Sequence, residues 1–285
     1  MILLQTELMR LLLHVPGDGF YRGTRFDASG VFDSVLFKGL ELCGRWFTAY
    51  DPFMHDAVCG PAEEFSPVGY DQAAPGGTFL KIGVGLLKRP SADAYDRFHL
   101  YEVADPGVWD VSAKECTVRY RHILDGWYDY IKVITLDGDS GITISHELTP
   151  RIALDAEVYN HNFFTLGRME VGPSRHLDFP FAPAGDWRAQ YDSVAFTGSG
   201  VRFSRQIQPG ESVYTGNIHT AGGSGMPYSM SLREGSACVR ISGDAPVTRT
   251  VLWANHRIAC LEPYNSLQAV SGQILRWTIK YSFEL

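Results

Sequence analysis

The sequence predicts an all-β protein built as a large antiparallel sandwich, and two features of its 285 residues point to that class. Aromatic residues make up 13% of the chain, and 29 glycines and 15 prolines are spread along it. Aromatic side chains favour strands, whereas glycine and proline favour tight turns. Short strands joined by many turns are typical of a sandwich and not of a helical bundle. Because all-β domains often reach this length as one unit, we expect a single domain over residues 1–285.

Strands are predicted where apolar and polar residues alternate, beginning in the middle of the chain. The segments 116–124 and 128–136 alternate in this way, and Asp125-Gly126 between them is a hairpin signal. The segment 142–148 continues the pattern. Further strands are expected at 193–197, 201–207, 237–241 and 248–254.

The last strand, at 274–283, is the clearest. One of its faces carries only apolar residues, namely Leu275, Trp277, Ile279, Tyr281 and Phe283. A period of two is that of a strand with one buried face. Long loops are expected at 61–77 and 222–227, and the segment 91–99 is the candidate for a short helix.

The composition narrows the classes of function. With 25 Lys and Arg against 32 Asp and Glu, the formal charge is −7, so the chain lacks the basic surplus that nucleic-acid binding requires. The five cysteines, an odd number far apart, predict free buried thiols in a reducing compartment. No leader pattern is evident, and no apolar run reaches the roughly 20 residues of a membrane span. We therefore expect a soluble cytoplasmic protein.

Two segments in the first quarter of the chain concentrate ionisable side chains. Arg22 and Arg25 lie among aromatic residues and glycines, where guanidinium groups could bind carboxylates or vicinal hydroxyls, or could cap a turn. The segment 50–65 is read as a loop that places His55, Asp56, Glu63 and Glu64 close together. Its spacing matches no metal-binding pattern, so no metal is expected, and contact with a substrate or local salt bridges remain as alternatives.

Two later segments each present one candidate for acid or base chemistry. In 158–164, Asn160 and Asn162 flank His161 and could fix its orientation, while the following phenylalanines limit water; the alternative is a histidine satisfied by backbone at a strand end. In 257–264, Glu262 follows an apolar run, where a strand is expected to pass into a loop. Partial desolvation there would raise the carboxyl pKa and make a better base, whereas an exposed glutamate would do neither.

Taken together, these segments resemble the galactose mutarotase-like family, also called the aldose 1-epimerases. The segment 158–164 is similar to the family's Asn-His-x-Tyr/Phe-Phe motif, and 257–264 is similar to its Cys-Leu-Glu-Pro-type motif. The resemblance implies a large antiparallel β-supersandwich, with His161 as the general acid and Glu262 as the general base. The two residues are 101 positions apart, in the family's chain order.

The resemblance also implies the class of ligand. Arg25 resembles an arginine that binds sugar hydroxyls, and His55 resembles a second histidine of the family, although its Phe-Met-His-Asp context differs from the usual Asn-x-Leu-His-Gly. We expect Arg22, Arg25, His55 and Lys81 to hold the sugar. The segment 60–65 has no counterpart in the sugar mutarotases and resembles less characterised bacterial relatives.

The predicted function is therefore that of an aldose 1-epimerase-like isomerase that needs no cofactor. Glu262 would remove the proton of the anomeric hydroxyl while His161, entering protonated, would protonate the ring oxygen. A carboxylate beside the imidazole would raise the histidine pKa from about 6.5. Two alternatives remain: an epimerase or β-eliminating lyase that uses the same pair on an oxidised or acidic sugar, and a carbohydrate-binding protein without catalysis. The sequence leaves the oligomeric state open.

Overall fold

The computed structural model describes residues 1–220 and 227–285, and strands account for nearly all of their regular structure. The prediction of an all-β fold is confirmed, since the only helical element described is the three-residue 3-10 turn η1 (Tyr191–Ser193). No helix in these two ranges has the length and apolar character needed to cross a membrane. The loop expected at 222–227 falls, except for its last residue, outside the described residues.

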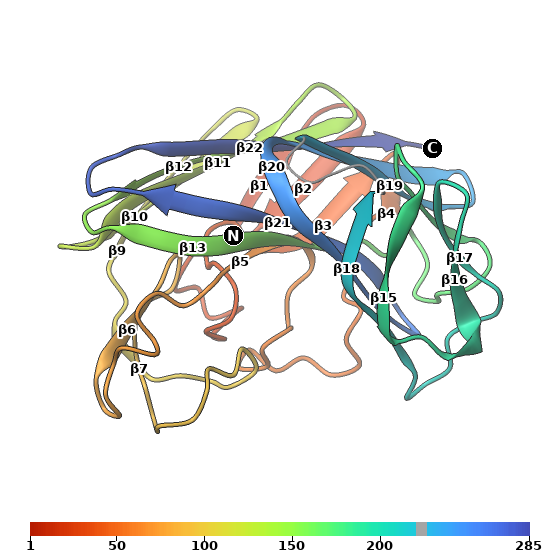
Figure 1. The fold of residues 1–285 in the computed structure, drawn as a ribbon. Coiled ribbons are helices and arrows are strands. Elements are labelled where there is room, and N and C mark those ends of the chain that lie inside the picture. The colour runs from red at the N-terminus through yellow and green to blue at the C-terminus, as the bar shows by residue number, and fades with distance from the viewer. Residues whose placement is uncertain (221–226) are drawn as a thin grey trace.

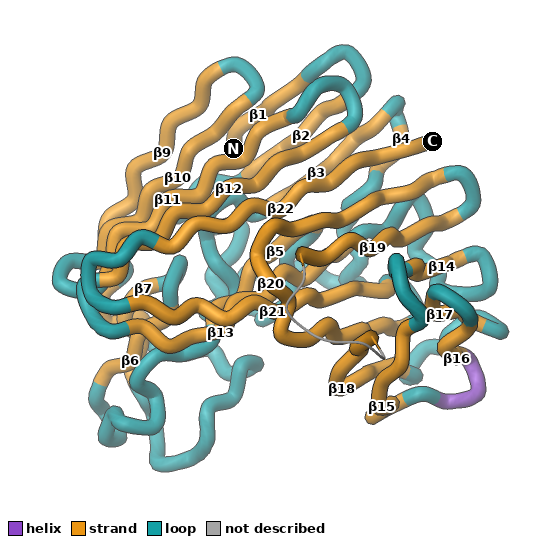
Figure 2. The backbone as a smooth tube through the Cα atoms, turned by 45° about the horizontal axis from the view of Figure 1, so that its top comes forward, coloured by secondary structure: helices purple, strands orange, loops and turns teal. Residues whose placement is uncertain are grey.

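Two antiparallel layers face each other across the core (Figure 1, Figure 2). In spatial order, the first layer contains β16 (Val194–Thr197), β17 (Gly200–Phe203), β14 (Arg175–Asp178), β19 (Pro227–Glu234), the first half of β20 (Ala237–Asn255), β22 (Leu275–Glu284), β12 (Gly141–Pro150), β11 (Tyr128–Leu136), β10 (Thr117–Leu124) and β9 (Val108–Lys114). The second layer contains β15 (Pro183–Ala189), β18 (Ser212–Thr220), the second half of β20, β21 (Ala259–Ala269), β13 (Leu154–Phe163) and β5 (Gly60–Phe65).

Two smaller sheets complete the described strands. One contains β1 (Ile2–Gln5), β2 (Met9–Leu13), β3 (Phe32–Phe37) and β4 (Leu40–Glu41), and the other contains β6 (Thr78–Lys81), β7 (Gly85–Lys88) and β8 (Val103–Asp105). The alternation predicted for the last strand is confirmed, because β22 buries Trp277, Ile279, Tyr281 and Phe283 against the core.

The strand β20 belongs to both layers. Its first part pairs with β22, for example Val239 with Phe283, and its later part pairs with β21, for example Leu252 with Leu261. The strands predicted at 237–241 and 248–254 are therefore one strand. Gly243 and Pro246 lie where the strand bends between the layers and its register shifts.

Predictions in the first third of the chain are wrong at two places. The loops predicted at 50–65 and 61–77 are confirmed over 50–59 and 66–77, but residues 60–65 form β5, a fully buried strand that pairs with β13. The predicted helix at 91–99 is a loop, because side chains hold its backbone in turns. Asp96 Oδ1 accepts the Phe98 N–H at 2.9 Å, and the Arg89 guanidinium binds the carbonyl oxygens of Ser91 and Ala92.

Candidate active site

A cavity of about 720 Å³ opens on the outer face of the second layer. Its lining comes from β13, β15, β18, β20 and β21, together with the loop between β2 and β3, the loop that precedes β5 and the loop between β7 and β8. Ligand pockets for small molecules typically measure about 300–1,000 Å³. The cavity is therefore large enough for a monosaccharide and its immediate substituents.

His161 projects into this cavity from β13. Its ring stacks on that of Phe163, two residues along the same face, with centroids 3.8 Å apart. Asn160 and Asn162 do not orient it, because successive side chains of a strand point to opposite faces. The Asn162 amide donates instead to the Leu261 carbonyl oxygen at 2.7 Å, and the Asn160 amide donates to Glu63 Oε1 at 3.2 Å. The imidazole is thus held by packing.

Glu262 reaches the same cavity from the middle of β21, not from the end of a strand as predicted. Its Oε1 lies 3.3 Å from His161 Nε2, and both side chains are buried. The strands β13 and β21 pair as far as Tyr159 and Tyr264 and then separate. Pro263, which has no N–H to donate, falls where this ladder ends. The separation leaves room for the two side chains to meet.

Burial shifts the proton affinity of both members of the pair. It raises the pKa of the Glu262 carboxyl to about 8, although the charges of Arg25 and Arg97 oppose the shift. It lowers the pKa of His161 well below the ordinary value, and the same two arginines add to that shift. The prediction that His161 enters protonated is therefore wrong for the protein without substrate. At neutral pH the pair holds one proton, on Glu262, because burial disfavours charge on either group.

Arg25 lies at the edge of the cavity and is fixed by a buried network. Its Nε donates to Glu64 Oε2 at 2.7 Å and its Nη2 donates to the Tyr159 hydroxyl at 2.8 Å, while Tyr159 itself donates to Glu64. Burial alone would raise the pKa of Glu64, but Lys81, Arg25 and Arg97 outweigh it and hold the pKa at about 2. The ionised carboxylate therefore orients the Arg25 guanidinium.

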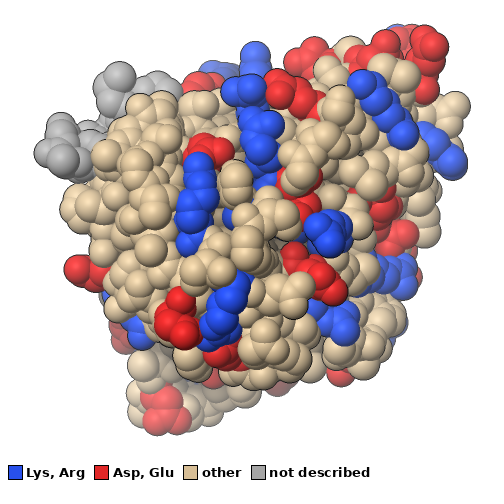
Figure 3. Space-filling view, turned by 90° about the vertical axis from the view of Figure 1, so that its right-hand side faces the viewer, with Lys and Arg blue, Asp and Glu red and all other residues tan. Residues whose placement is uncertain are grey.

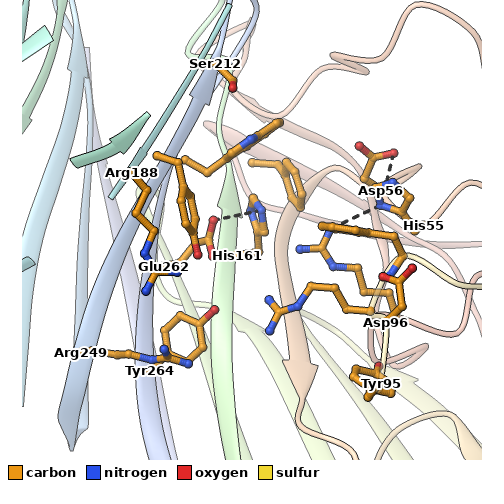
Figure 4. A pocket seen from close by; sticks show the side chains of 16 residues that line it. His55, Asp56, Tyr95, Asp96, His161, Arg188, Ser212, Arg249, Glu262 and Tyr264 are labelled. Carbon is orange, nitrogen blue, oxygen red and sulfur yellow. Dashed lines mark hydrogen bonds and ion pairs between the residues drawn. The ribbon is translucent and has the colours of Figure 1, made fainter. Parts of the chain in front are cut away.

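The structure brings together Arg25, His55, His161 and Glu262 but leaves Arg22 and Lys81 outside the lining (Figure 4). The Nδ1 of His55 is 3.4 Å from Arg25 Nη1, and burial lowers the pKa of this imidazole. The Arg22 guanidinium is exposed and lies over the Phe53 ring. Lys81 is fully buried, and its Nζ donates to Glu64 at 3.3 Å and to the Tyr95 hydroxyl at 3.0 Å.

Of the four ionisable residues expected together in 50–65, His55 and Asp56 line the cavity, and the alternation of β5 separates Glu63 from Glu64. Glu64 faces the cavity side, whereas Glu63 faces the core between the layers. There Glu63 pairs with Lys132, which also donates to Asp27. Within the two described ranges, no three His, Cys, Asp or Glu side chains are grouped as metal ligands.

Several lining residues were missed by the sequence analysis. The loop misread as a helix contributes Tyr95, Asp96, Arg97 and Phe98, and the strands contribute Arg188, Tyr214, Arg249, Trp253 and Tyr264. A signal was available on β20, because Arg249 and Trp253 fall on one face of the predicted strand 248–254. None was available for Arg97, whose Nη1 donates to the Tyr159 hydroxyl at 3.2 Å from a distant loop.

Comparison with known proteins identifies the fold. No family model matches the chain, and no curated protein does. Among solved structures, a galactose mutarotase-like protein from Lactobacillus casei is 12% identical over 100% of both chains, with a TM-score of 0.56. A GalM/aldose epimerase homologue from C. elegans is 15% identical over 99% of this chain and 98% of its own, with a TM-score of 0.55. A galactose mutarotase-like protein from Clostridium acetobutylicum is 12% identical over 99% and 94%, with a TM-score of 0.58. The chain therefore has the galactose mutarotase-like fold that its short motifs predicted.

Proposed function

We propose that the protein is an aldose 1-epimerase-like isomerase that interconverts the anomers of a sugar. The observation that carries the proposal is the buried contact of 3.3 Å between His161 Nε2 and Glu262 Oε1, which lies in a cavity of monosaccharide size. A protein that only binds carbohydrate has no need of such a pair. Structures of the same fold include one described as galactose 1-epimerase from Lactobacillus acidophilus.

The reaction needs one proton removed and one added at the same time. The Glu262 carboxylate takes the proton of the anomeric hydroxyl as the bond between C1 and the ring oxygen breaks, and the His161 imidazolium protonates that oxygen. The free aldehyde then turns about the C1–C2 bond, and the reverse transfers close the ring on its other face. The pair starts and ends with one proton, which in the empty cavity lies on Glu262 and must pass to His161 when the sugar binds.

The remaining groups of the cavity would hold the sugar. Trp253, whose side chain is partly exposed, offers a ring face that suits the apolar side of a pyranose, and Arg25 and His55 offer donors for its hydroxyls. Of the other two predicted sugar contacts, Lys81 would act through Glu64, which it helps to keep ionised. Arg22 would require movement of its loop to reach the sugar.

Replacement of Glu262 by glutamine tests the proposal. The change preserves the shape of the side chain and removes the base, so anomer exchange followed by NMR should slow by about 10²- to 10⁴-fold. Glu7→Gln, which makes the same change at an exposed turn, should exchange anomers at the parent rate. Unaltered turnover in Glu262→Gln would reject the role of the pair.

An acidic sugar is the second candidate substrate, because Arg97, Arg188 and Arg249 also line the cavity. On such a sugar the same pair could catalyse epimerisation or β-elimination next to a carbonyl. Elimination from a uronide creates a conjugated product, so its ultraviolet absorbance separates this reaction from anomer exchange. A sugar-dependent thermal shift with no turnover of either kind would instead indicate a carbohydrate-binding protein.

A further inference from the structure

The cavity is cationic on a protein whose net charge is negative. Four arginines and no lysine line it, although the formal charge of the chain is −7. On the face shown in Figure 3, Lys and Arg side chains lie among Asp and Glu rather than in a patch of one sign. The arginine cluster is thus a local feature. Arg25 and Arg97 share Glu64, which leaves Arg188 and Arg249 to be explained.

Arg188 is positioned by the backbone beside it. A Cβ atom on Gly216 of the neighbouring strand β18 would lie 2.5 Å from Arg188 Nε and 2.9 Å from its Nη2, so the guanidinium occupies space that a side chain would fill. The pairing of β15 with β18 shifts register on both sides of Trp187, and such irregularities re-aim side chains. No carboxylate of the described residues forms an ion pair with Arg188.

Arg249 is held by an aromatic ring against its guanidinium group and by one carboxylate. Its guanidinium carbon lies 4.0 Å from the centroid of the Tyr264 ring, and its Nη2 donates to Glu157 Oε2 at 3.0 Å. Its Nε is buried and has no acceptor among the residues that the structure describes. Native proteins rarely leave a buried donor unpaired, so this position indicates an absent acceptor.

The charges are also arranged by side (Figure 4). Arg188 and Arg249 lie with Tyr264 and Glu262 on one side, whereas Asp56 and Asp96 lie with His55 on the other. Glu262 adds little negative charge near the arginines at neutral pH, because its carboxyl keeps its proton up to a pKa of about 8. An anion entering the cavity is thus attracted to the arginine side.

We infer that the cavity accepts an anionic sugar, bearing a carboxylate or a phosphate, and that Arg188 and Arg249 bind its anionic group. The planar forks of two guanidinium groups match either anion, which a neutral aldose does not offer. The inference rests on the proposed function only in that the ligand is a sugar. It gives that sugar a direction, with the anion beside Arg188 and Arg249 and the ring toward His161.

Binding measurements test the inference without turnover. Glucuronate, glucose 6-phosphate and glucose are titrated into the protein by calorimetry, and at least one anionic sugar should bind more than tenfold tighter than glucose. The two anions separate carboxylate from phosphate as the bound group. Added salt should weaken binding of the anionic sugar and leave binding of glucose unchanged, since ionic screening acts only on the charged ligand.

Single variants assign the effect to residues. Arg188→Gln and Arg249→Gln should each lower the affinity for the anionic sugar about tenfold and leave the affinity for glucose unchanged. The control Arg10→Gln, on the exposed side of β2, should alter neither affinity. Both cavity arginines are partly exposed, and melting curves check that the variants fold. Equal binding of all three sugars, no binding, or anion affinity unchanged in both variants would overturn the inference. If these results hold but Glu262→Gln exchanges anomers normally, only the proposed reaction fails.

Discussion

His161 and Glu262 show how burial can set the protonation of two neighbouring residues. Both are almost fully enclosed, and each is therefore biased toward its neutral form: the carboxyl pKa rises to about 8 while the imidazole pKa falls. Proton transfer in either direction needs one proton on the pair. In the proposed reaction, the acid and base roles therefore depend on where a bound sugar places its hydroxyl and its ring oxygen, and not on the charge of the empty site.

The first prediction at this scale concerns activity. Above pH 8, Glu262 loses its proton and neither member of the pair carries one, so the rate of anomer exchange should fall about tenfold per pH unit. A pH profile of kcat/KM measures this limb, because that ratio reports the ionisation of the enzyme without bound sugar. A rate that stays level from pH 7 to pH 10 would show that Glu262 does not titrate in this range or does not matter.

The second prediction concerns stability. The pKa of Glu262 is about 8 in the folded protein against an ordinary 4.5, so the folded state binds this proton more tightly. The resulting stabilisation is complete below pH 4.5 and is lost as the pH rises to 8, by up to about 1.4 kcal/mol per unit. Glu262→Gln lacks this loss, so its free energy of unfolding in denaturant, relative to that of the parent protein, should increase between pH 5 and pH 8. A constant difference would contradict the assignment.

Lys81 gives a third prediction, which separates a structural role from contact with the sugar. Removing one member of a buried ion pair costs about 3–5 kcal/mol, and Lys81 is fully buried on Glu64. Lys81→Met should therefore lower the melting temperature markedly while the KM of the residual enzyme changes little. A large rise in KM at an unchanged melting temperature would instead indicate that Lys81 contacts the sugar.

At the scale of elements, the alternation of side chains along a strand decides which residues reach the cavity and which reach the core. On β13 it sends His161 and Phe163 to the cavity and Asn160 and Asn162 to the core, and on β5 it divides Glu64 from Glu63. Neighbours in sequence thus take part in different networks. Consecutive polar residues within a strand therefore form two separate groups, one on each face.

The strand β18, which lies between β15 and β20, yields the prediction that belongs to this scale. Gly216→Val would place a side chain where the Arg188 guanidinium now lies, and that flexible group would move aside at little cost to stability. Affinity for the anionic sugar should then fall as it does in Arg188→Gln, although Arg188 itself is intact. Undiminished affinity in this variant would show that Arg188 does not need its position over Gly216.

Alternation and turn residues were sufficient to predict much of the fold. They located β10, β11, β12 and β22, because these strands bury one face and leave the other at least partly exposed. They failed for β5, whose six residues are all buried and therefore do not alternate, and for the loop after β7, whose turns depend on contacts of Arg89 and Asp96. Two short motifs indicated His161 and Glu262. Of the arginines of the cavity, Arg25 was predicted from the resemblance and Arg249 lies on a face of the predicted strand 248–254, whereas Arg97 and Arg188 could not be found, since only the fold brings them to the cavity.

On the scale of the whole molecule, acid is the expected route to unfolding. Glu63 and Glu64 lie back to back on β5, each ionised in a buried network, with a pKa of about 2 against an ordinary 4.5. Their stabilisation is present above pH 4.5 and is lost as the pH falls toward 2. The free energy of unfolding from guanidinium titrations should therefore drop steeply below pH 4.5. A level value down to pH 2.5 would contradict the ionised networks.

The path of β20 through both layers ties the cavity to the core by one length of backbone. Pairing with β22 fixes the register at Val239, and the length of the connection, with its register shifts between Gly243 and Arg249, sets the face on which Arg249 and Trp253 lie. One residue added or removed in this connection would turn every later side chain over. Arg249 would then face the apolar interior and Leu252 the solvent. The number of residues in a bend that touches no ligand thus decides whether the protein has a binding site at all.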